Sequence, residues 1–469
     1  MSHPAAPPPD APTEIPAHTP GVWRVGSLAY TGRGLVVLFL LLLAGDFAWS
    51  MKERSVMPLF QILLKKYETS DLLTGLLIGS IPALIGLAVG PVVSVWSDRL
   101  RCSWGRRIPF LALPTPIIVG SMVALAFSPS LGPWLNALTG GDPNNDRAWI
   151  ISLFAVFWTL FEVFTIVANA VFNGLVNDVV PRVMIGRFFG LFRMVSLGAG
   201  VLFNYFLIGY AKEHYIPVFL AVAAGYGVGF TVMCTYVKEG TYPDPPPLPR
   251  KRSVGEEIAT YFRECTAQPF FLWVFALLAL TTITFIPVNI FSIPAAESFH
   301  LSMDEYGVYV AIAYVCSITL AFPLGWMTDR FHPLVTGGIT LALYAVLMLG
   351  SYFGIDSPRT FGFALLAHTV LSGAFFTTTA GLGLMLFPRM KFSQFMSAAG
   401  LVTSLIQALV SPALGRILDA TGHDYRNTYL LGSLLAFASL IVWLVVYRRF
   451  QAMGGITGYT APEVGAPRG

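Results

Sequence analysis

Long stretches without an acidic residue, a lysine or an arginine alternate with short polar segments along most of the chain. Four of these stretches are 72–97, 215–237, 306–328 and 331–355. Each is long enough for a transmembrane helix, which needs about 20 apolar residues to cross the hydrocarbon core. Lipid cannot satisfy open backbone groups, and the stretches lack the alternation of a barrel, so we expect helices. The pattern predicts about twelve of them, centred near residues 44, 84, 118, 160, 202, 226, 282, 317, 344, 374, 405 and 438.

The composition supports an all-α integral membrane protein. Hydrophobic residues make up 55% of the chain and charged residues 12%, and the mean hydropathy is +0.67. Such values are far from those of an ordinary soluble domain. Four scattered cysteines show no metal-ligand spacing, so we expect neither a metal site nor a disulfide framework. The Pro-rich start precedes a full-length apolar run, so no cleavable signal peptide is expected.

The basic residues predict the orientation. If the amino terminus lies inside, most of the 29 basic residues fall in tails and loops on the same side. The positive-inside rule then places both termini in the cytoplasm, with the chain in the plasma or inner membrane. These loops account for the net charge of +4, so no nucleic-acid partner is expected.

The polar segments divide the chain into five parts. We expect a disordered cytoplasmic tail (1–32), a six-helix bundle (33–237), a cytoplasmic linker (238–268), a second six-helix bundle (269–450) and a cytoplasmic tail (451–469). Within the linker, residues 253–265 can form a short surface helix. Its lipid-facing edge would carry Ile258, Tyr261 and Phe262.

Two short motifs occur once in each half. The Asp98-Arg99 pair at the end of one span recurs as Asp329-Arg330, and the Pro-Arg pair ending at Arg182 recurs at Arg389. Both pairs occur in the same order at corresponding helix ends. The chain therefore looks like one membrane-embedded half used twice, an organisation on which many secondary transporters are built.

The segment 90–110 resembles the loop between the second and third helices of the major facilitator superfamily. There an Asp-Arg pair and a Gly-Arg-Arg triplet bracket a tight turn, as Asp98-Arg99 and Gly105-Arg106-Arg107 do here. The fuller motif is similar to that of the sucrose transporters and related glycoside–cation symporters. Helix four of that group carries an embedded acid, a polar stretch and a second acid, which matches Glu162 to Asp178. One departure is Asn173, because the plant members carry an arginine in this stretch. The resemblance implies two six-helix bundles and a small-molecule substrate, with sugar as the expected class.

Two acids within predicted spans are the candidates for proton handling. Ionisable groups inside a membrane are costly and are functional candidates by default. Glu162 lies near the middle of its helix, and Asp46 lies within the first span. The alternative is that each acid is paired permanently with a cation for packing.

Polar residues of the first span share one helix face. Positions 46, 49/50, 53/54 and 57 recur every three to four residues, so they should face a polar cavity. Arg54 is expected to pair with Glu53 or with Glu162, and exchange between these pairs could form a gate. The alternative places Lys52, Glu53 and Arg54 at the outer interface, with the lysine reaching toward water.

Amides and aromatic rings suit an uncharged, hydroxylated ligand, since sugars present hydroxyl edges and an apolar ring face. His368 is added because imidazole titrates near neutral pH, although a histidine held inside the bundle is equally compatible. The candidates are Trp49, Trp158, Asn169, Asn173, Asn204, Asn289, His368 and Gln407.

The charged loop motifs are expected to form a latch at the cytoplasmic face that biases the two transport states. A second role, setting the topology, applies to the same basic residues. The latch candidates are Asp98, Arg99, Arg106, Arg107, Asp178, Arg182, Arg187, Asp329, Arg330 and Arg389.

These patterns together predict a secondary active transporter, with proton-coupled symport of a sugar or glycoside as the leading hypothesis. No phosphate loop, zinc cluster or nucleophile motif stands out, so we expect no enzyme activity and no cofactor. The coupling ion is expected to be a proton, with sodium as the alternative. The expected partners are a small solute and the lipid bilayer, with a monomer as the favoured state. Alternatives are transport or export of another small solute, and a non-transporting sensor or assembly protein.

Overall fold

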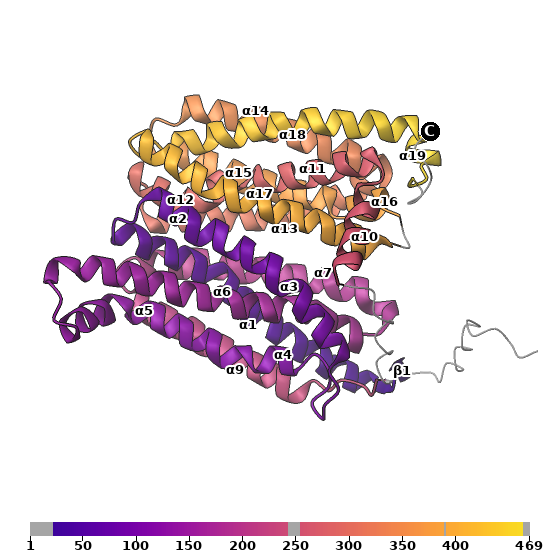
Figure 1. Cartoon of the computed structure of the whole chain (residues 1–469), viewed down its shortest axis with the longest axis horizontal. Coiled ribbons are helices and arrows are strands. Elements are labelled where there is room, and N and C mark those ends of the chain that lie inside the picture. Colours follow the sequence, from indigo (N-terminus) through magenta and orange to yellow (C-terminus); the bar gives the residue numbers. More distant parts are fainter. Residues whose placement is uncertain (1–21, 243–253, 389–390, 463–469) are drawn as a thin grey trace, which may run out of the picture.

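The computed structural model describes residues 22–242, 254–388 and 391–462. Within these ranges, twelve helical segments are long and apolar enough to cross a membrane, which confirms the all-α membrane fold. Figure 1 shows two groups of helices lying side by side, one from each half of the chain. The first helix begins and the last long helix ends at the same end of the molecule, here called the terminal end.

The first half supplies six of the candidate spans, several of them built from more than one helical piece. Their bounds are α1 Gly32–Lys66, α2 Asp71–Gly75, η1 Leu76–Ser80, α3 Ile81–Arg99, α4 Pro109–Ala112, α5 Pro114–Leu138, η2 Pro143–Asn145, α6 Asp146–Val179, η3 Arg182–Met184, α7 Ile185–Leu202, η4 Phe203–Leu207, α8 Ile208–Ala211 and α9 Tyr215–Tyr236.

The second half supplies the other six, preceded by one helix of the linker. Their bounds are α10 Val254–Thr266, α11 Pro269–Ile283, α12 Ile286–Ser298, α13 Met303–Phe331, α14 Pro333–Gly354, α15 Pro358–Thr379, α16 Leu382–Leu386, α17 Phe392–Ala420, α18 Arg426–Ala452 and α19 Gly455–Gly458.

Local sequence sets where these helices begin. Proline stands at the first turn of α5, α11, α14 and α15, where its missing N–H costs no hydrogen bond. Ser302 and Glu305 form a capping box at the start of α13. Within the spans, many Ser and Thr hydroxyls donate to the carbonyl four residues earlier, which satisfies them in the absence of water.

The two halves contact each other away from the terminal end. There α2, η1 and α3 pack on α17, α1 packs on α12, and α7, η4 and α8 pack on α13. Glycines permit this close approach, because a Cβ at Gly75 or Gly415 would collide with the backbone of the opposite half. The halves are therefore sealed together at the end opposite the termini.

Two expectations about the segments outside the bundles need correction. Residues 22–31 are not disordered: Val22–Val25 (β1) pairs antiparallel with Leu28–Thr31 (β2) across a turn at Gly26, whose φ is +54°. The short linker helix is present as α10, but Tyr261 does not face lipid. Its hydroxyl donates to the carbonyl of Gln394, because α10 packs on α11 and α17.

Candidate substrate and proton site

A polar cavity of about 430 Å³ lies on the inner side of the first half, between α1, α6 and α7. It brings together six residues that the sequence singled out, namely Asp46, Trp49, Glu53, Arg54, Asn169 and Asn173. The remaining lining residues are Ser50, Phe172, Phe192 and Ser196. The expectation that the polar face of the first helix meets a cavity is therefore confirmed.

Asp46 is the more buried of the two acids that line this cavity. Its side chain is only 6% exposed, and its Oδ2 atom has no hydrogen-bond partner in the described structure. A buried carboxylate without a partner is strongly disfavoured as an ion. A proton or a ligand hydroxyl would satisfy this oxygen.

Lys52 is the residue that the sequence analysis failed to recognise. It is fully buried, and its ammonium donates to Glu53 Oε1 at 2.7 Å and to Thr165 Oγ1 at 3.3 Å. The same ammonium lies 3.7 Å from the centre of the Trp49 ring. The lysine therefore does not reach toward an outer interface. Its position three residues after Trp49, on one helix face, is the only signal that the sequence offered.

Glu162 lies on α6 within electrostatic range of two α1 side chains. Lys52 attracts its carboxylate, and Glu53 repels it. Within the described ranges no hydrogen bond or ion pair holds the Glu162 side chain itself. It is therefore not locked permanently to a cation.

Arg54 does not form the expected pair with Glu53 or Glu162. Its guanidinium donates to the Tyr314 hydroxyl at 3.2 Å and to Ser196 Oγ at 3.5 Å. Because Tyr314 belongs to α13, this contact joins the two halves beside the cavity. Arg193 on α7 interacts electrostatically with the same guanidinium and the same tyrosine.

Two predicted substrate contacts are packing residues instead. The Trp158 indole is 2% exposed, stacks on Phe60 at 4.2 Å and donates to the carbonyl of Leu77. Leu77 lies in the π-helical turn η1, where a carbonyl accepts from the N–H five residues later. That residue is Pro82 at the start of α3, which has no N–H, so the carbonyl is available. Asn204 is 4% exposed and donates to the carbonyl of Gly200 within its own helix.

The predicted second-half residues form a separate group that does not line this cavity. His368 is buried, and its two ring nitrogens lie 3.0 Å from the Tyr344 hydroxyl and from Asn289 Oδ1. The arrangement fits a neutral ring that donates to Asn289 and accepts from Tyr344. Gln407 instead donates to the carbonyl of Gly79, across the contact between the halves.

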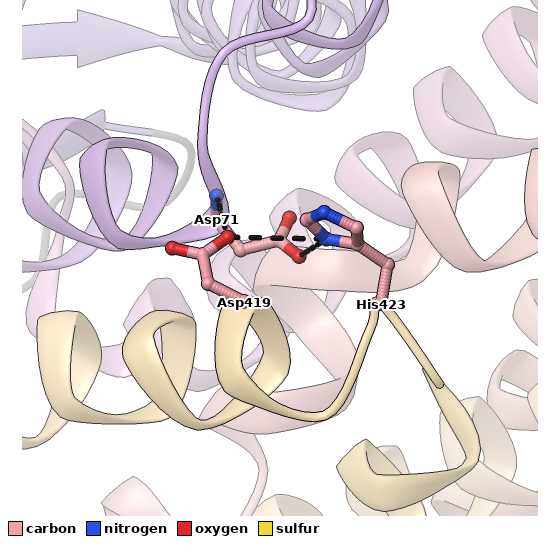
Figure 2. Close-up of side chains that lie close together, drawn as sticks. All are labelled: Asp71, Asp419 and His423. Carbon is pink, nitrogen blue, oxygen red and sulfur yellow. Dashed lines mark hydrogen bonds and ion pairs between the residues drawn. The ribbon is translucent and has the colours of Figure 1, made fainter.

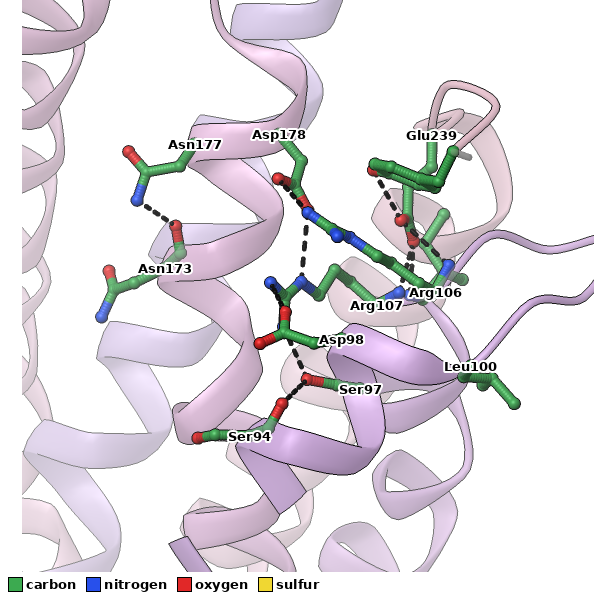
Figure 3. Close-up of polar contacts among 12 residues, drawn as sticks. Ser94, Ser97, Asp98, Leu100, Arg106, Arg107, Asn173, Asn177, Asp178 and Glu239 are labelled. Carbon is green, nitrogen blue, oxygen red and sulfur yellow. Dashed lines mark hydrogen bonds and ion pairs between the residues drawn. The ribbon is translucent and has the colours of Figure 1, made fainter. Parts of the chain in front are cut away.

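The Gly-Arg-Arg loop forms a charge cluster within the first half (Figure 3). Arg106 makes a two-pronged contact with Asp178, with nitrogen–oxygen distances of 2.7 to 3.0 Å. Arg107 lies 3.2 Å from the same carboxylate and pairs with Asp98 at 2.5 Å. The cluster therefore joins α3 and the loop before α4 to the end of α6. Charge-assisted hydrogen bonds are strong, and a two-pronged arginine–carboxylate pair also fixes the relative orientation of the two groups.

Glu239 is a member of this cluster that the sequence analysis missed. Its carboxylate accepts from the backbone N–H groups of Arg106, Arg107 and Ile108 at 2.7 to 3.0 Å (Figure 3). Burial, followed by the nearby carboxylates, raises the pKa of Tyr242, so its hydroxyl stays protonated and donates to Glu239. The sequence offered one signal, a glycine (Gly105) shortly before the proline that begins α4. In the structure Gly105 has a positive φ, and the backbone N–H groups at this helix start need an acceptor.

Several expected latch residues lie outside the cluster. Arg99, Arg182 and Arg187 make no ion pair in the described ranges, and Arg389 lies outside the described residues. Asp329 has no partner there either, and Arg330 packs only near the rings of Trp326 and Phe331. Among the described residues, Asp329 and Arg330 therefore form no charge cluster like that of Asp98, Arg106 and Arg107, because no oppositely charged side chain lies close to them.

A third group joins the halves at the end opposite the termini (Figure 2). Asp71 accepts from His423 at 2.8 Å and from the Tyr425 hydroxyl at 3.0 Å. Asp419 accepts from the backbone N–H groups of Asp71 and Leu72. Asp71, Asp419 and His423 are close enough to hold a metal ion. Their oxygens already accept hydrogen bonds, so the group is satisfied as a contact between the halves.

Comparison with known proteins agrees with this fold. The family model of the Major Facilitator Superfamily matches residues 284–456. Sucrose transport protein SUT4 of Oryza sativa, in both the indica and japonica subspecies, is 30% identical over 102 residues. Those residues cover 22% of this chain and only 16% of each relative.

Solved transporter structures superpose on most of the chain. A variant of the nucleoside transporter NupG aligns with a TM-score of 0.66 and 11% identity, covering 87% of this chain and 100% of that chain. The inward open xylose transporter XylE from E. coli aligns with a TM-score of 0.62 and 15% identity, covering 87% and 95%. At these identities the likeness concerns the fold.

The twelve candidate spans thus define a multi-pass membrane protein whose fold is that of the solved transporter structures. The resemblance to the major facilitator superfamily is confirmed, with a weaker similarity to sucrose transport proteins.

Proposed function

We propose that the chain is a proton-coupled symporter that carries a sugar or glycoside by alternating access between its two halves. The observation that carries this proposal is the cavity between α1, α6 and α7, in which an unpartnered buried acid meets amides and an indole. We further propose that it lies in the cell membrane with both termini in the cytoplasm, in agreement with the basic loops.

The lining residues divide the work. Asn169 and Asn173 offer amide donors and acceptors to sugar hydroxyls, and Trp49 offers an apolar ring face. Asp46 and Glu162 are the proton carriers, since both sit inside spans where a proton removes an expensive charge. Arg54 links the cavity to Tyr314 in the opposite half, so a ligand beside it can influence how the halves meet.

The arrangement of contacts fits one state of such a cycle. In the described residues, the hydrogen bonds that join the halves lie between the cavity and the end opposite the termini. With cytoplasmic termini, this is a state closed to the outside. The opposite state requires that the Asp71 group separates and that the terminal end closes.

Sugar is preferred over other cargo because of the match to sucrose transport proteins and because the cavity offers both amides and an aromatic face. The proton is preferred over sodium as the coupling ion because a lone buried carboxylate oxygen is suited to a proton, whereas sodium binds several oxygens. No cofactor is required by this cycle.

The test uses purified full-length protein in proteoliposomes carrying a pH-sensitive dye. Glucose, sucrose, maltose and xylose are added outside one at a time, with uridine as a non-sugar probe. We expect at least one sugar to acidify the lumen, and Glu162→Gln to abolish the signal. Glu213→Gln, in the loop before α9, is the matched control that keeps it.

Three results would contradict the proposal. A signal with uridine alone would replace the sugar by another cargo. Sugar uptake that depends on sodium and moves no proton would replace the coupling ion. Silence with every solute, from protein shown to be folded by its thermal transition, would end the transport proposal.

A further inference from the structure

Lys52 has no place yet in the proposed cycle, although it is the most buried cation of the first half. Its side chain has no exposed surface, and it lies on α1 within a membrane span. An ammonium in such surroundings costs several kcal/mol, on the order of the penalties for buried ions, unless its partners compensate it. Its compensation comes from Glu53, Thr165 and the Trp49 ring.

Lys52 touches the cavity through two of those partners. Trp49 and Glu53 both line the cavity, whereas Lys52 lies behind them. Glu53 is 45% exposed while the lysine is fully covered, so the ion pair faces the cavity with its negative end. Any shift of the ammonium therefore changes two side chains that a ligand would meet.

The lysine also lies beside Glu162, the proposed proton carrier on α6. Its ammonium donates to Thr165, three residues further along that helix, and lies 5.3 Å from the centre of the adjacent Phe161 ring, so it attracts the Glu162 carboxylate. Two carboxylates, those of Glu53 and Glu162, thus share one cation. The trio is neutral only when one of the two carboxylates is protonated, and burial favours the neutral combination. Because the hydrogen bond goes to Glu53, Glu162 is the group left to hold the proton.

The surroundings of Glu162 supply few other ionisable groups. α5, which packs on α6, carries none, and α3 carries only Asp98 and Arg99 in its last two positions. From α9, the Tyr226 ring lies 5.5 Å from the Lys52 ammonium. Beyond these and the Lys52–Glu53 pair, α1 carries Asp46 and Arg54 near the cavity and Arg33, Lys65 and Lys66 toward its two ends, and α7 carries Arg187 and Arg193.

We infer that Lys52 is a positioning residue that links proton binding at Glu162 to sugar binding in the cavity, an inference that rests on the proposed function. With Glu162 protonated, the ammonium stays on Glu53 and Trp49, and the sugar-binding wall is formed, as in this structure. When Glu162 gives its proton to water, its carboxylate competes for the ammonium. Lys52 then moves away from Glu53 and Trp49, and the sugar binds weakly.

This exchange of the ammonium between the two carboxylates makes proton binding and sugar binding favour each other, as symport requires. The proton strengthens sugar binding, and by reciprocity the sugar strengthens proton binding. A lysine that served only to fill space between α1 and α6 would affect affinity or stability without changing how sugar affinity depends on pH.

The test measures sugar binding to purified full-length protein against pH, by tryptophan fluorescence with glucose, sucrose, maltose and xylose. In the unmodified protein, one linked proton changes the dissociation constant by up to about tenfold per pH unit. Glu162→Gln should bind tightly, with affinity that is flat against pH. Lys52→Met should bind weakly and also be flat, whereas Lys52→Arg should keep the slope. Lys66→Met, on the same helix, is the control and should match the unmodified protein.

A second readout needs no sugar. The carboxyl band of Glu162 in the infrared spectrum, assigned by its loss in Glu162→Gln, should persist to higher pH in Lys52→Met. A preserved slope of affinity against pH in Lys52→Met, weak binding by Glu162→Gln, or an unmoved carboxyl band would overturn the inference while leaving sugar transport intact. If the unmodified protein binds no sugar, the proposed function falls, and the linkage falls with it.

Discussion

The centres of the two halves differ in kind: the first is charged and the second is neutral. Around the cavity of the first half lie Asp46, Lys52, Glu53, Arg54 and Glu162. In the interior of the second half, His368 is held between a tyrosine hydroxyl and an amide oxygen. Each ring nitrogen of the histidine has a neutral partner, whereas an acid of the first half has an oxygen without one. Under the proposed function, this contrast predicts that proton handling belongs to the first half and that the second half serves as the opposing wall.

The loops at the terminal end show the same asymmetry from a common sequence. Asp98-Arg99 and Asp329-Arg330 look like copies of one motif, but among the described residues only the first belongs to a charge cluster. There Arg106 and Arg107 meet Asp178, and the backbone N–H groups meet Glu239. The Asp-Arg pair is present in both halves, but the residues that it contacts in the first half, such as the Gly-Arg-Arg triplet, are not. A repeated motif therefore forms the same contacts only where its partner residues are repeated too.

The largest effect that tests this contrast is expected at Asp46. Asp46→Asn keeps the size of the side chain and removes its ability to carry a proton. We expect proton-driven uptake to fall by about a hundredfold, which corresponds to about 2.7 kcal/mol. The measurement is the initial rate of sugar uptake into proteoliposomes under an imposed pH gradient.

The matched control for Asp46→Asn is Asn289→Asp, which adds an acid to the second half beside His368. If proton handling belongs to the first half, this addition cannot restore uptake to Asp46→Asn. Unchanged uptake by Asp46→Asn alone would show that its unpartnered oxygen has no part in coupling.

The next effect compares the two loop motifs. Asp178→Asn leaves two guanidinium groups without their shared carboxylate, so we expect a loss of about 2–3 kcal/mol of unfolding free energy. Asp329→Asn removes an exposed charge without a described partner and should change stability by less than about 0.5 kcal/mol. Thermal unfolding in detergent measures both. Equal effects would mean that the second loop forms a charge cluster after all.

Much of the architecture could be predicted from the sequence because lipid permits few alternatives. The twelve spans follow from the length of the apolar stretches, even where a few charged residues interrupt them, and the shared face of Asp46, Trp49 and Glu53 follows from helical spacing. The burial of Lys52 could not be predicted in this way. It depends on how α1 packs against α6 and α9, which spacing along one helix does not specify.

Contacts between distant segments were equally inaccessible to sequence reasoning. Asp71 and His423 are separated by most of the chain and meet only because α2 and α17 pack closely. Glu239 contacts the Gly-Arg-Arg loop only through the tertiary packing of the first bundle, because more than 130 residues separate them in the sequence. Trp158 does not line the cavity in this structure, because its N–H donates to a Leu77 carbonyl left free by a π-helical turn that the sequence pattern does not reveal.

A smaller effect tests whether the second-half centre is structural. His368→Leu leaves the Tyr344 hydroxyl without its ring partner, so we expect a loss of about 1–2 kcal/mol of unfolding free energy. The pH profile of uptake should keep its shape, since neither partner of the ring is an acid or a base at neutral pH. Tyr344→Phe is the control, with a loss of about 1 kcal/mol. A shifted pH profile in His368→Leu would move part of the proton chemistry into the second half.

The smallest effect concerns the linker, which shows the asymmetry once more because the described part of α10 docks on the second half. Hydrogen bonds from Gln394 and Lys391 to Glu264 hold its pKa below the ordinary value of 4.5. A lowered pKa in the folded state means that the contact stabilises docking at pH values above the ordinary pKa of the carboxyl, and that this stabilisation is lost as the pH falls through the lowered pKa.

At neutral pH, Glu264→Gln should therefore loosen α10 slightly. We expect faster amide exchange over residues 260–266 with an unchanged thermal transition. Asp424→Asn is the control, because Arg426 lowers the pKa of that carboxyl at a site remote from α10. Exchange that is unchanged in Glu264→Gln would mean that the apolar contacts of α10 alone hold it on α11 and α17.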